Sequence, residues 1–292
     1  MGSAMAAGEA WTSDFEAAKK QATDGKKSLL LEFTGSDWCP PCKRLNQEVF
    51  SQEAFVTGVK DKLVLVKLDF PRDKSKISEA TMAQNDALQE KYSITGYPTI
   101  LLADEQGKPF AKTGYRPGGA EEYVKHLDEL LAVRAKRDAA FIEAAKIEGV
   151  GKAKALVSAI EAMGLDEAIV ASFYSEQINA IKAADPKDES GYIKGIESKA
   201  KFMEFQDQIN ELGSKQDFEA IMKKIDETLA AGTFEGELKQ QAMIFKAITH
   251  MQLKKPEEAL KTLDEAKAVD PESQVSKAID GLKKRIEAST PK

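Results

Sequence analysis

The chain has 292 residues, of which 31% are charged, and a formal net charge of −6. This length suggests two domains. The acidic balance argues against nucleic acid as a partner, because proteins that bind it carry a basic face. No apolar stretch approaches the roughly 20 residues that a membrane-spanning helix needs. The only two cysteines, Cys39 and Cys42, are too few for a disulfide framework.

Residues 1–10 begin Met-Gly-Ser-Ala-Met, which is typical of an expression tag joined to a mature start. We therefore expect a tag or flexible N-terminus here, and a signal peptide that has been removed.

The first predicted strand covers residues 28–34, whose apolar run is too short for a buried helix. A loop at 35–37 leads into Trp-Cys-Pro-Pro-Cys at residues 38–42. Residues 43–50 then have helical spacing and place Leu45, Val49 and Phe50 on the inner side. The two cysteines are therefore expected at the start of a helix.

A cysteine pair in this place favours redox chemistry. Cys39 would lie at the exposed helix N-terminus, where unpaired N–H groups and the helix dipole stabilise a thiolate. Cys42 would lie one turn further in, shielded but within reach for a disulfide. A structural zinc site usually needs four ligands, and the only histidines, His126 and His250, are far apart in the sequence. We therefore predict no metal site, and we expect His126 to be structural.

The elements that follow alternate between strand and helix. A second, parallel strand is predicted at 63–69 and a polar helix at 75–92. Gly-Tyr-Pro-Thr at 96–99 then enters a strand at 100–103. A glycine-containing turn at 104–108, an edge strand at 109–115 and an amphipathic helix at 121–131 complete the series.

This order of strand, loop, Trp-Cys-x-x-Cys and helix, with Gly-Tyr-Pro-Thr before a later strand, resembles the thioredoxin family across residues 11–133. The resemblance implies an α/β thioredoxin fold, in which a central mixed sheet is flanked by helices. It implies a thiol-disulfide oxidoreductase with Cys39 as the nucleophile and Cys42 as the resolving cysteine. No cofactor is expected beyond this dithiol.

The resemblance also assigns Trp38, Tyr97, Pro98 and Thr99 to the substrate-binding surface, with Pro98 in cis, and makes Glu32 a candidate proton acceptor for the resolving cysteine. Each residue has an alternative role. Trp38 could serve only in packing, Pro98 could be a trans proline at a strand start, and Glu32 could face water. The chain departs from ordinary thioredoxins in the loop before Trp38, which is one residue longer.

The residues between the cysteines bear on the direction of electron flow. Pro40 and Pro41 supply neither charge nor an extra donor, and the motif resembles that of plant-type thioredoxins and tryparedoxins, which are reductants. We therefore predict a disulfide reductase that acts on protein substrates and is served by a redox partner protein. Residues 32–39 also resemble thioredoxin-like proteins exported by Gram-negative bacteria. This favours a periplasmic or exported location over a cytoplasmic one.

Residues 134–292 are rich in alanine, lysine and glutamate and predict an all-α domain of roughly seven or eight antiparallel helices. One 34-residue stretch that starts at Gln240 resembles a tetratricopeptide repeat (TPR). The residues that match are Ala247, Ala259, Leu263, Ala266 and Pro271. A plain helical bundle is the alternative. The domain would dock a protein substrate or redox partner; alternatively, it would form oligomers of a disulfide isomerase or chaperone-like module.

Overall fold

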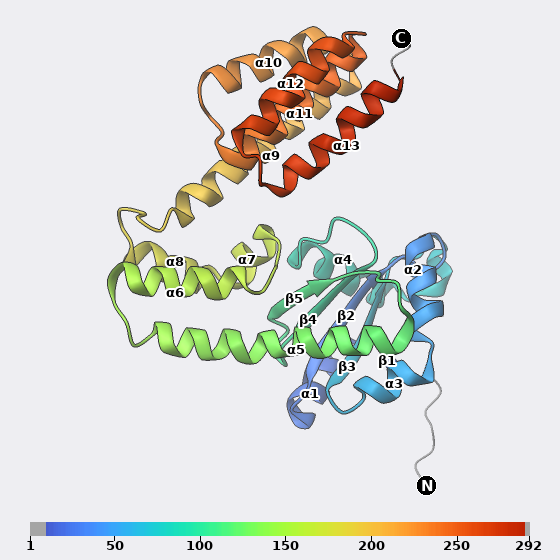
Figure 1. The fold of residues 1–292 in the computed structure, drawn as a ribbon. Coiled ribbons are helices and arrows are strands. Elements are labelled where there is room, and N and C mark those ends of the chain that lie inside the picture. Colours follow the sequence, from blue (N-terminus) through green and yellow to red (C-terminus); the bar gives the residue numbers. More distant parts are fainter. Residues whose placement is uncertain (1–9, 290–292) are drawn as a thin grey trace. The chain divides into compact units, whose positions relative to one another are not determined.

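The structure, a computed structural model, describes residues 10–289 and comprises two compact units, residues 1–190 and 191–292 (Figure 1). The expected tag at residues 1–10 lies, apart from its last residue, outside the described residues. None of the described helices combines the length and apolar character that crossing a bilayer requires.

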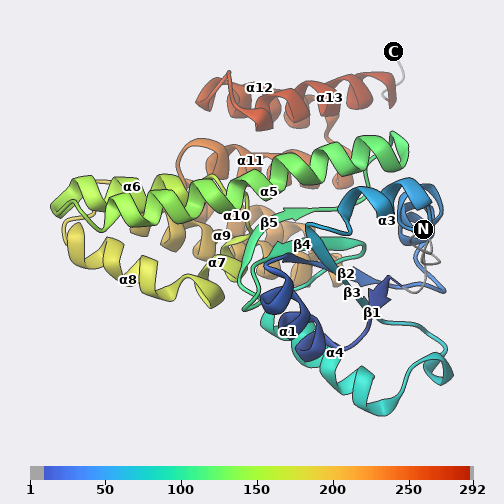
Figure 2. The ribbon, with the colours of Figure 1, turned by 90° about the horizontal axis from the view of Figure 1, so that it is seen from below.

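Five strands form the sheet of the first unit: β1 (Trp11–Thr12), β2 (Ser28–Thr34), β3 (Leu63–Asp69), β4 (Thr99–Ala103) and β5 (Pro109–Thr113). Their order is β1-β3-β2-β4-β5, with β1 and β2 parallel to β3 (Figure 2). β4 runs antiparallel to β2, and β5 runs antiparallel to β4. This is the mixed sheet that the family resemblance predicts.

The first unit also contains eight described helices and two short helical turns. They are α1 (Phe15–Gly25), α2 (Pro40–Leu45), α3 (Glu53–Val59), α4 (Glu79–Lys91), α5 (Gly119–Ala144), α6 (Gly149–Glu161), α7 (Glu167–Phe173) and α8 (Ser175–Ala184), with a π-helical turn η1 (Asn46–Phe50) and a 3₁₀ turn η2 (Lys74–Lys76). The helix expected at 43–50 is thus divided, because α2 gives way to the π turn at Asn46. Its inner residues Leu45, Val49 and Phe50 are buried as predicted.

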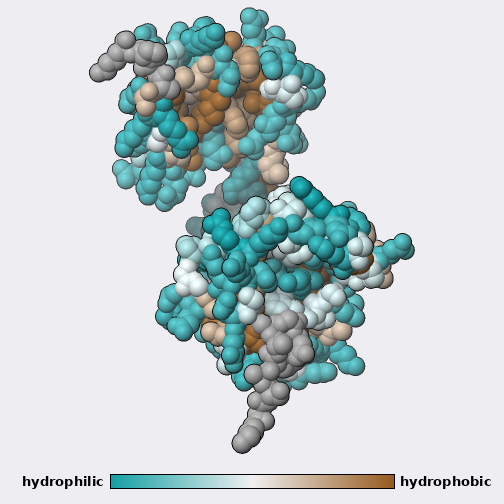
Figure 3. Space-filling model, turned by 90° about the vertical axis from the view of Figure 1, so that its right-hand side faces the viewer, coloured by the Kyte–Doolittle hydropathy of each residue, from teal (hydrophilic) through white to brown (hydrophobic). Residues whose placement is uncertain are grey.

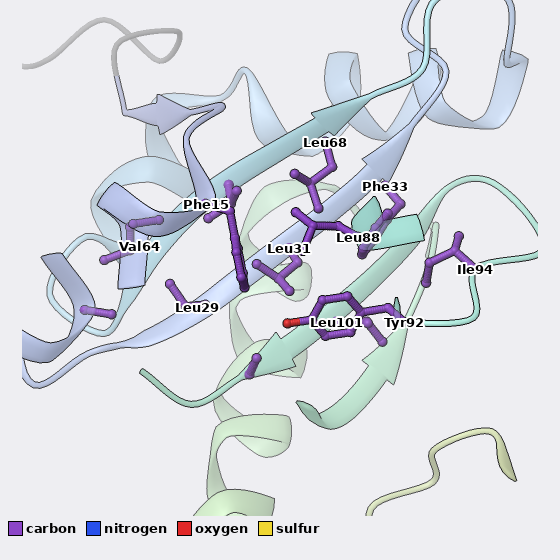
Figure 4. Close-up of a cluster of buried hydrophobic side chains, with 14 of the residues drawn as sticks. Phe15, Leu29, Leu31, Phe33, Val64, Leu68, Leu88, Tyr92, Ile94 and Leu101 are labelled. Atoms are coloured by element: carbon purple, nitrogen blue, oxygen red, sulfur yellow. The ribbon is translucent and has the colours of Figure 1, made fainter. Parts of the chain in front are cut away.

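One face of the sheet packs against α1 and α4. Because side chains alternate along a strand, Leu29, Leu31 and Phe33 of β2 all point to this face. They join Phe15 of α1 and Tyr92, just after α4, in one buried cluster (Figure 4). The Tyr92 hydroxyl donates a hydrogen bond of 2.6 Å to the Gly107 carbonyl, so this buried phenol has a partner.

The first unit extends beyond the predicted domain boundary at residue 133. The sequence predicts that the last helix of this domain ends at residue 131, but α5 continues to Ala144, and α6–α8 belong to the same compact unit. Ile169 of α7 is fully buried in the cluster around Tyr92, and the Phe173 ring stacks on the Tyr92 ring at 4.7 Å. These apolar contacts tie α7 to the sheet, and the compact unit runs on to residue 190.

A buried polar network joins the same elements. The Arg137 guanidinium of α5 donates to the Tyr174 hydroxyl at 3.0 Å and lies 3.3 Å from the Asp104 carboxylate. The Tyr174 hydroxyl donates in turn to the Pro109 carbonyl at 2.6 Å. All three side chains in the network are less than 10% exposed, so each polar group needs the others.

The second unit contains α9 (Tyr192–Ser214), α10 (Phe218–Ala230), α11 (Gly236–Gln252), α12 (Pro256–Val269) and α13 (Gln274–Ser289). Together, α6–α13 give eight helices after α5 within the described residues, as the glycine and Asx-Pro breaks predict. One apolar cluster joins α9, α10 and α11, and another joins α11, α12 and α13. The small or apolar residues expected at helix contacts are all buried: Ala247, Ala259, Leu263 and Ala266.

Candidate active site

The cysteine pair lies where β2 passes through a short loop into α2. Cys39 is the N-cap of α2, and its amide donates to the Gly35 carbonyl at 2.9 Å. Pro40 occupies the first helical turn, where a missing N–H costs nothing. The Sγ atoms of Cys39 and Cys42 form a disulfide, and the Cys42 amide donates to the Cys39 Sγ at 3.3 Å. A backbone donor of the helix therefore points at the first sulfur.

The exposure expected for Cys39 is not found. Cys39 is only 3% exposed, and Cys42 is 1% exposed. The Cys39 sulfur is bonded to Cys42 and turned toward the first turn of α2, so the disulfide form shields both sulfurs.

Trp38 directly precedes Cys39 in the chain and is half-buried. Its indole Nε1 donates to the Phe70 carbonyl at 2.8 Å, and its ring meets the Tyr97 ring edge-on at 5.6 Å. The ring lies so close to Gly35 that a Cβ there would come within 2.4 Å of Trp38. The loop from β2 therefore needs glycine at this position.

The Gly-Tyr-Pro-Thr segment meets the active-site loop through the contact of Tyr97 with Trp38. The Tyr97–Pro98 peptide bond is cis, and both residues are half-buried. Thr99 is the first residue of β4 and pairs with Phe33 of β2. Its hydroxyl donates to the Gly96 carbonyl at 2.8 Å, which fixes the turn before the strand.

Glu32 lies in the middle of β2, in register with Lys67 of β3. Its side chain is 1% exposed, so the alternative in which it faces water is wrong. Its Oε2 lies 3.8 Å from the Lys67 ammonium and has no hydrogen-bond partner among the described residues. Burial raises the pKa of Glu32 to about 7, although the nearby Lys67 charge acts in the opposite direction.

Replacing Glu32 with glutamine should remove a pH dependence of stability. The folded protein holds the Glu32 pKa near 7, against 4.5 for the free side chain, so the charged form is disfavoured in the fold. The wild type should therefore lose about 3 kcal/mol relative to Glu32→Gln as the pH rises from below 4.5 to above 7. Urea unfolding of the oxidised proteins at pH 4.5 and pH 8 measures this difference. Parallel pH profiles would mean that Glu32 is already ionised in the fold.

Asp37 has a role in this site that its sequence position does not reveal. The Asp37 carboxylate accepts the backbone N–H groups of Asp73 and Arg72 at 3.0 and 2.9 Å, and these donors hold its pKa at about 2. Lys43 donates to the Asp37 carbonyl at 2.7 Å. Asp37 thus ties the active-site loop to the segment after β3. An aspartate before Trp38 is visible in the sequence, but its partners lie 35 and 36 residues away, and nothing local identifies them.

A mixed sheet with a cysteine disulfide at the start of α2 defines a thiol-disulfide oxidoreductase of the thioredoxin fold. Comparison with known proteins agrees. The sequence profile described as "Thioredoxin-like domain" matches residues 15–131. The disulfide bond reductase DsbH of Chlamydia pneumoniae is 33% identical over 124 residues, which are 42% of this chain and 74% of that protein. The chain therefore belongs to the thioredoxin-like family.

Two further matches cover the same part of the chain. The thioredoxin-related protein DsbJ of Chlamydia pneumoniae is 28% identical over 104 residues, which are 36% of this chain but only 30% of that protein. A solved structure described as "DsbH Oxidoreductase" is 30% identical, with a TM-score of 0.38, over 39% of this chain and 79% of that one.

Proposed function

We propose that the protein is a disulfide reductase for exported protein substrates. The observation that carries this proposal is the cysteine pair at the start of α2, separated by two prolines that bring no charge to the sulfurs. A histidine between the cysteines would favour an oxidant, because it stabilises the thiolate. The related DsbH is described as a reductase, which supports the same direction.

In the proposed reaction the dithiol form of the enzyme attacks a substrate disulfide. The Cys39 thiolate forms a bond to one substrate sulfur, and the other substrate sulfur leaves as a thiolate that takes up a proton. Cys42 then gives its proton to Glu32 and attacks the Cys39 sulfur of the mixed disulfide. The second substrate sulfur leaves as a thiolate that also takes up a proton, so the substrate gains two electrons and two protons and the enzyme returns to the disulfide form. A redox partner protein must then supply two electrons.

The substrate would lie against Trp38, Tyr97, Pro98 and Thr99. Trp38 and Tyr97 are in contact and only half-buried, so they can offer apolar surface beside the cysteine pair. Thr99 begins β4 and fixes the turn that presents Pro98. In this proposal Trp38 contacts the substrate and does not serve only in packing.

We further propose that the second unit is TPR-like and docks an apolar segment of the protein substrate. A groove of about 620 Å³ lies between α9, α10 and α11. Its apolar lining includes Ile209, Phe245 and the 44%-exposed Ile248, and its neutral amides Asn210 and Gln252 could pair with a peptide backbone. Figure 3 shows apolar surface among hydrophilic residues on this unit.

The reduction potential of the Cys39–Cys42 pair tests the direction of the reaction. A value near that of thioredoxin, approximately −270 mV, is expected for a reductant. A value of roughly −120 to −180 mV would instead indicate an oxidase or isomerase. Equilibration with glutathione buffers, followed by mass spectrometry of the alkylated protein, gives the potential directly.

A fragment of residues 1–190 tests the docking role. It contains one complete compact unit with the cysteine pair. It should reduce a small disulfide as fast as the full chain does, but a protein disulfide more slowly. In the full chain, Ile248→Glu should slow only the protein substrate. Equal rates on the protein substrate would favour the oligomeric alternative, which sedimentation of the full chain would then examine.

A further inference from the structure

The segment from Phe70 to Lys76 is folded onto the active-site loop. The Trp38 indole donates to the Phe70 carbonyl at 2.8 Å. The Asp37 carboxylate accepts the Arg72 and Asp73 amides at 2.9 and 3.0 Å. These three bonds all involve the backbone of the segment. Its position beside Trp38 therefore does not depend on its own side chains.

This anchoring brings a guanidinium group to the active-site tryptophan. The Arg72 Cζ lies 5.4 Å from the centroid of the Trp38 ring, within the range of a cation–π contact. Arg72 is an exposed residue. Tyr97 contacts the same indole edge-on at 5.6 Å. The guanidinium and the phenol therefore both contact the indole of Trp38, the residue that precedes Cys39.

The charge of Arg72 is not neutralised locally. Within residues 10–289, no carboxylate lies within 4 Å of its guanidinium. The neighbouring carboxylates have other partners: Asp37 accepts two amides and lies 3.4 Å from the Lys76 ammonium. Asp73 accepts the amide and hydroxyl of Ser75 at 3.1 and 2.6 Å. Five guanidinium donors are thus available to a ligand.

We propose that Arg72 is a specificity-determining residue that favours substrate disulfides flanked by carboxylates. The inference rests on the proposed reductase function and names the class of substrate. A segment that crosses Trp38 toward Cys39 passes the guanidinium, which can bind a carboxylate through two parallel hydrogen bonds. Stacking on Trp38 restricts the side chain before the substrate arrives, so less freedom is lost on binding.

Single-turnover kinetics with the full chain test this proposal. The reduced enzyme would be mixed with three cystine peptides that differ only in the residues beside the disulfide: glutamate, serine or lysine. The wild type should prefer the glutamate peptide. In Arg72→Gln the ratio of glutamate to serine rates should fall roughly three- to tenfold, the range expected for one partly screened charge. Arg72→Glu should reverse the order, and 0.5 M NaCl should weaken the preference in the wild type.

Lys74→Gln is the matched control, because it removes an equal charge from an exposed residue of the same segment. It should retain the wild-type ratio. An equal fall in Lys74→Gln, or an unchanged ratio in Arg72→Gln, would overturn the assignment to Arg72. Arg72→Lys keeps the charge and should retain part of the preference. If neither the wild type nor any variant, in its reduced form, reduces the serine peptide, the proposed reductase function is wrong. This outcome differs from a failure of the Arg72 proposal, in which the serine peptide is still reduced.

Discussion

Replacing Cys42 with serine should trap a covalent complex between Cys39 and a substrate. In this variant Cys39 can still attack a disulfide, but no second thiol remains to release the product. Turnover should fall by about a thousandfold or more, as expected when a group of a concerted catalytic set is lost. Non-reducing electrophoresis and mass spectrometry would detect the mixed disulfide and identify the joined residue.

Cys39→Ser provides the control for this experiment. It leaves Cys42 in place, behind the N-cap of α2 and 1% exposed in the disulfide form. This variant should neither turn over substrate nor accumulate the complex. If Cys39→Ser accumulates the complex and Cys42→Ser does not, the nucleophile and the resolving cysteine have been assigned in the wrong order.

A fragment ending at Val133 should be far less stable than a fragment ending at Ser190. The shorter fragment lacks Ile169, Phe173 and Tyr174, all of which pack on the sheet or on the elements beside it. Each large side chain of this kind contributes about 1.5–3 kcal/mol by burial, so the loss should exceed roughly 5 kcal/mol. For a domain of ordinary stability this amounts to unfolding.

Urea denaturation followed by circular dichroism compares the two fragments. Arg137→Leu in the full chain is a milder test, because it removes the guanidinium that contacts both Tyr174 and Asp104. It leaves the 5%-exposed Asp104 without its cation and should destabilise the first unit by about 3 kcal/mol. A fragment ending at Val133 that unfolds at the same urea concentration as the longer one would show that α6–α8 contribute little to the sheet.

Local sequence patterns predict the elements around the cysteine pair well. An apolar run, a loop and a helix start are each visible in consecutive residues, and their order gives the mixed sheet around β2. The sequence does not decide whether Glu32 is buried, because a charged residue within an apolar run can face either a helix or water. β2 lies between β3 and β4 in the sheet, and the folded structure buries Glu32 to 1% exposure. Neither fact is visible in the local sequence.

The buried network of Arg137, Asp104 and Tyr174 cannot be predicted from local sequence patterns. Asp104 lies at a predicted turn and Arg137 in a charged helical stretch, positions that usually face water. Their burial depends on Tyr174, which is 37 residues beyond Arg137 in sequence. Long-range partners of this kind carry no local periodicity. The sequence therefore predicts a boundary at residue 133, where the family resemblance ends, whereas the compact unit ends at residue 190.

The length of α5 has a practical consequence. Its 26 residues run without a break from the sheet, which it contacts near its start, to the Arg137 network that holds Tyr174. α8 begins at the next residue, Ser175. A spectroscopic label on α8 therefore shares one frame of reference with the cysteine pair. Distances measured from such a label would locate a trapped substrate relative to Cys39 without any modification of the active-site loop.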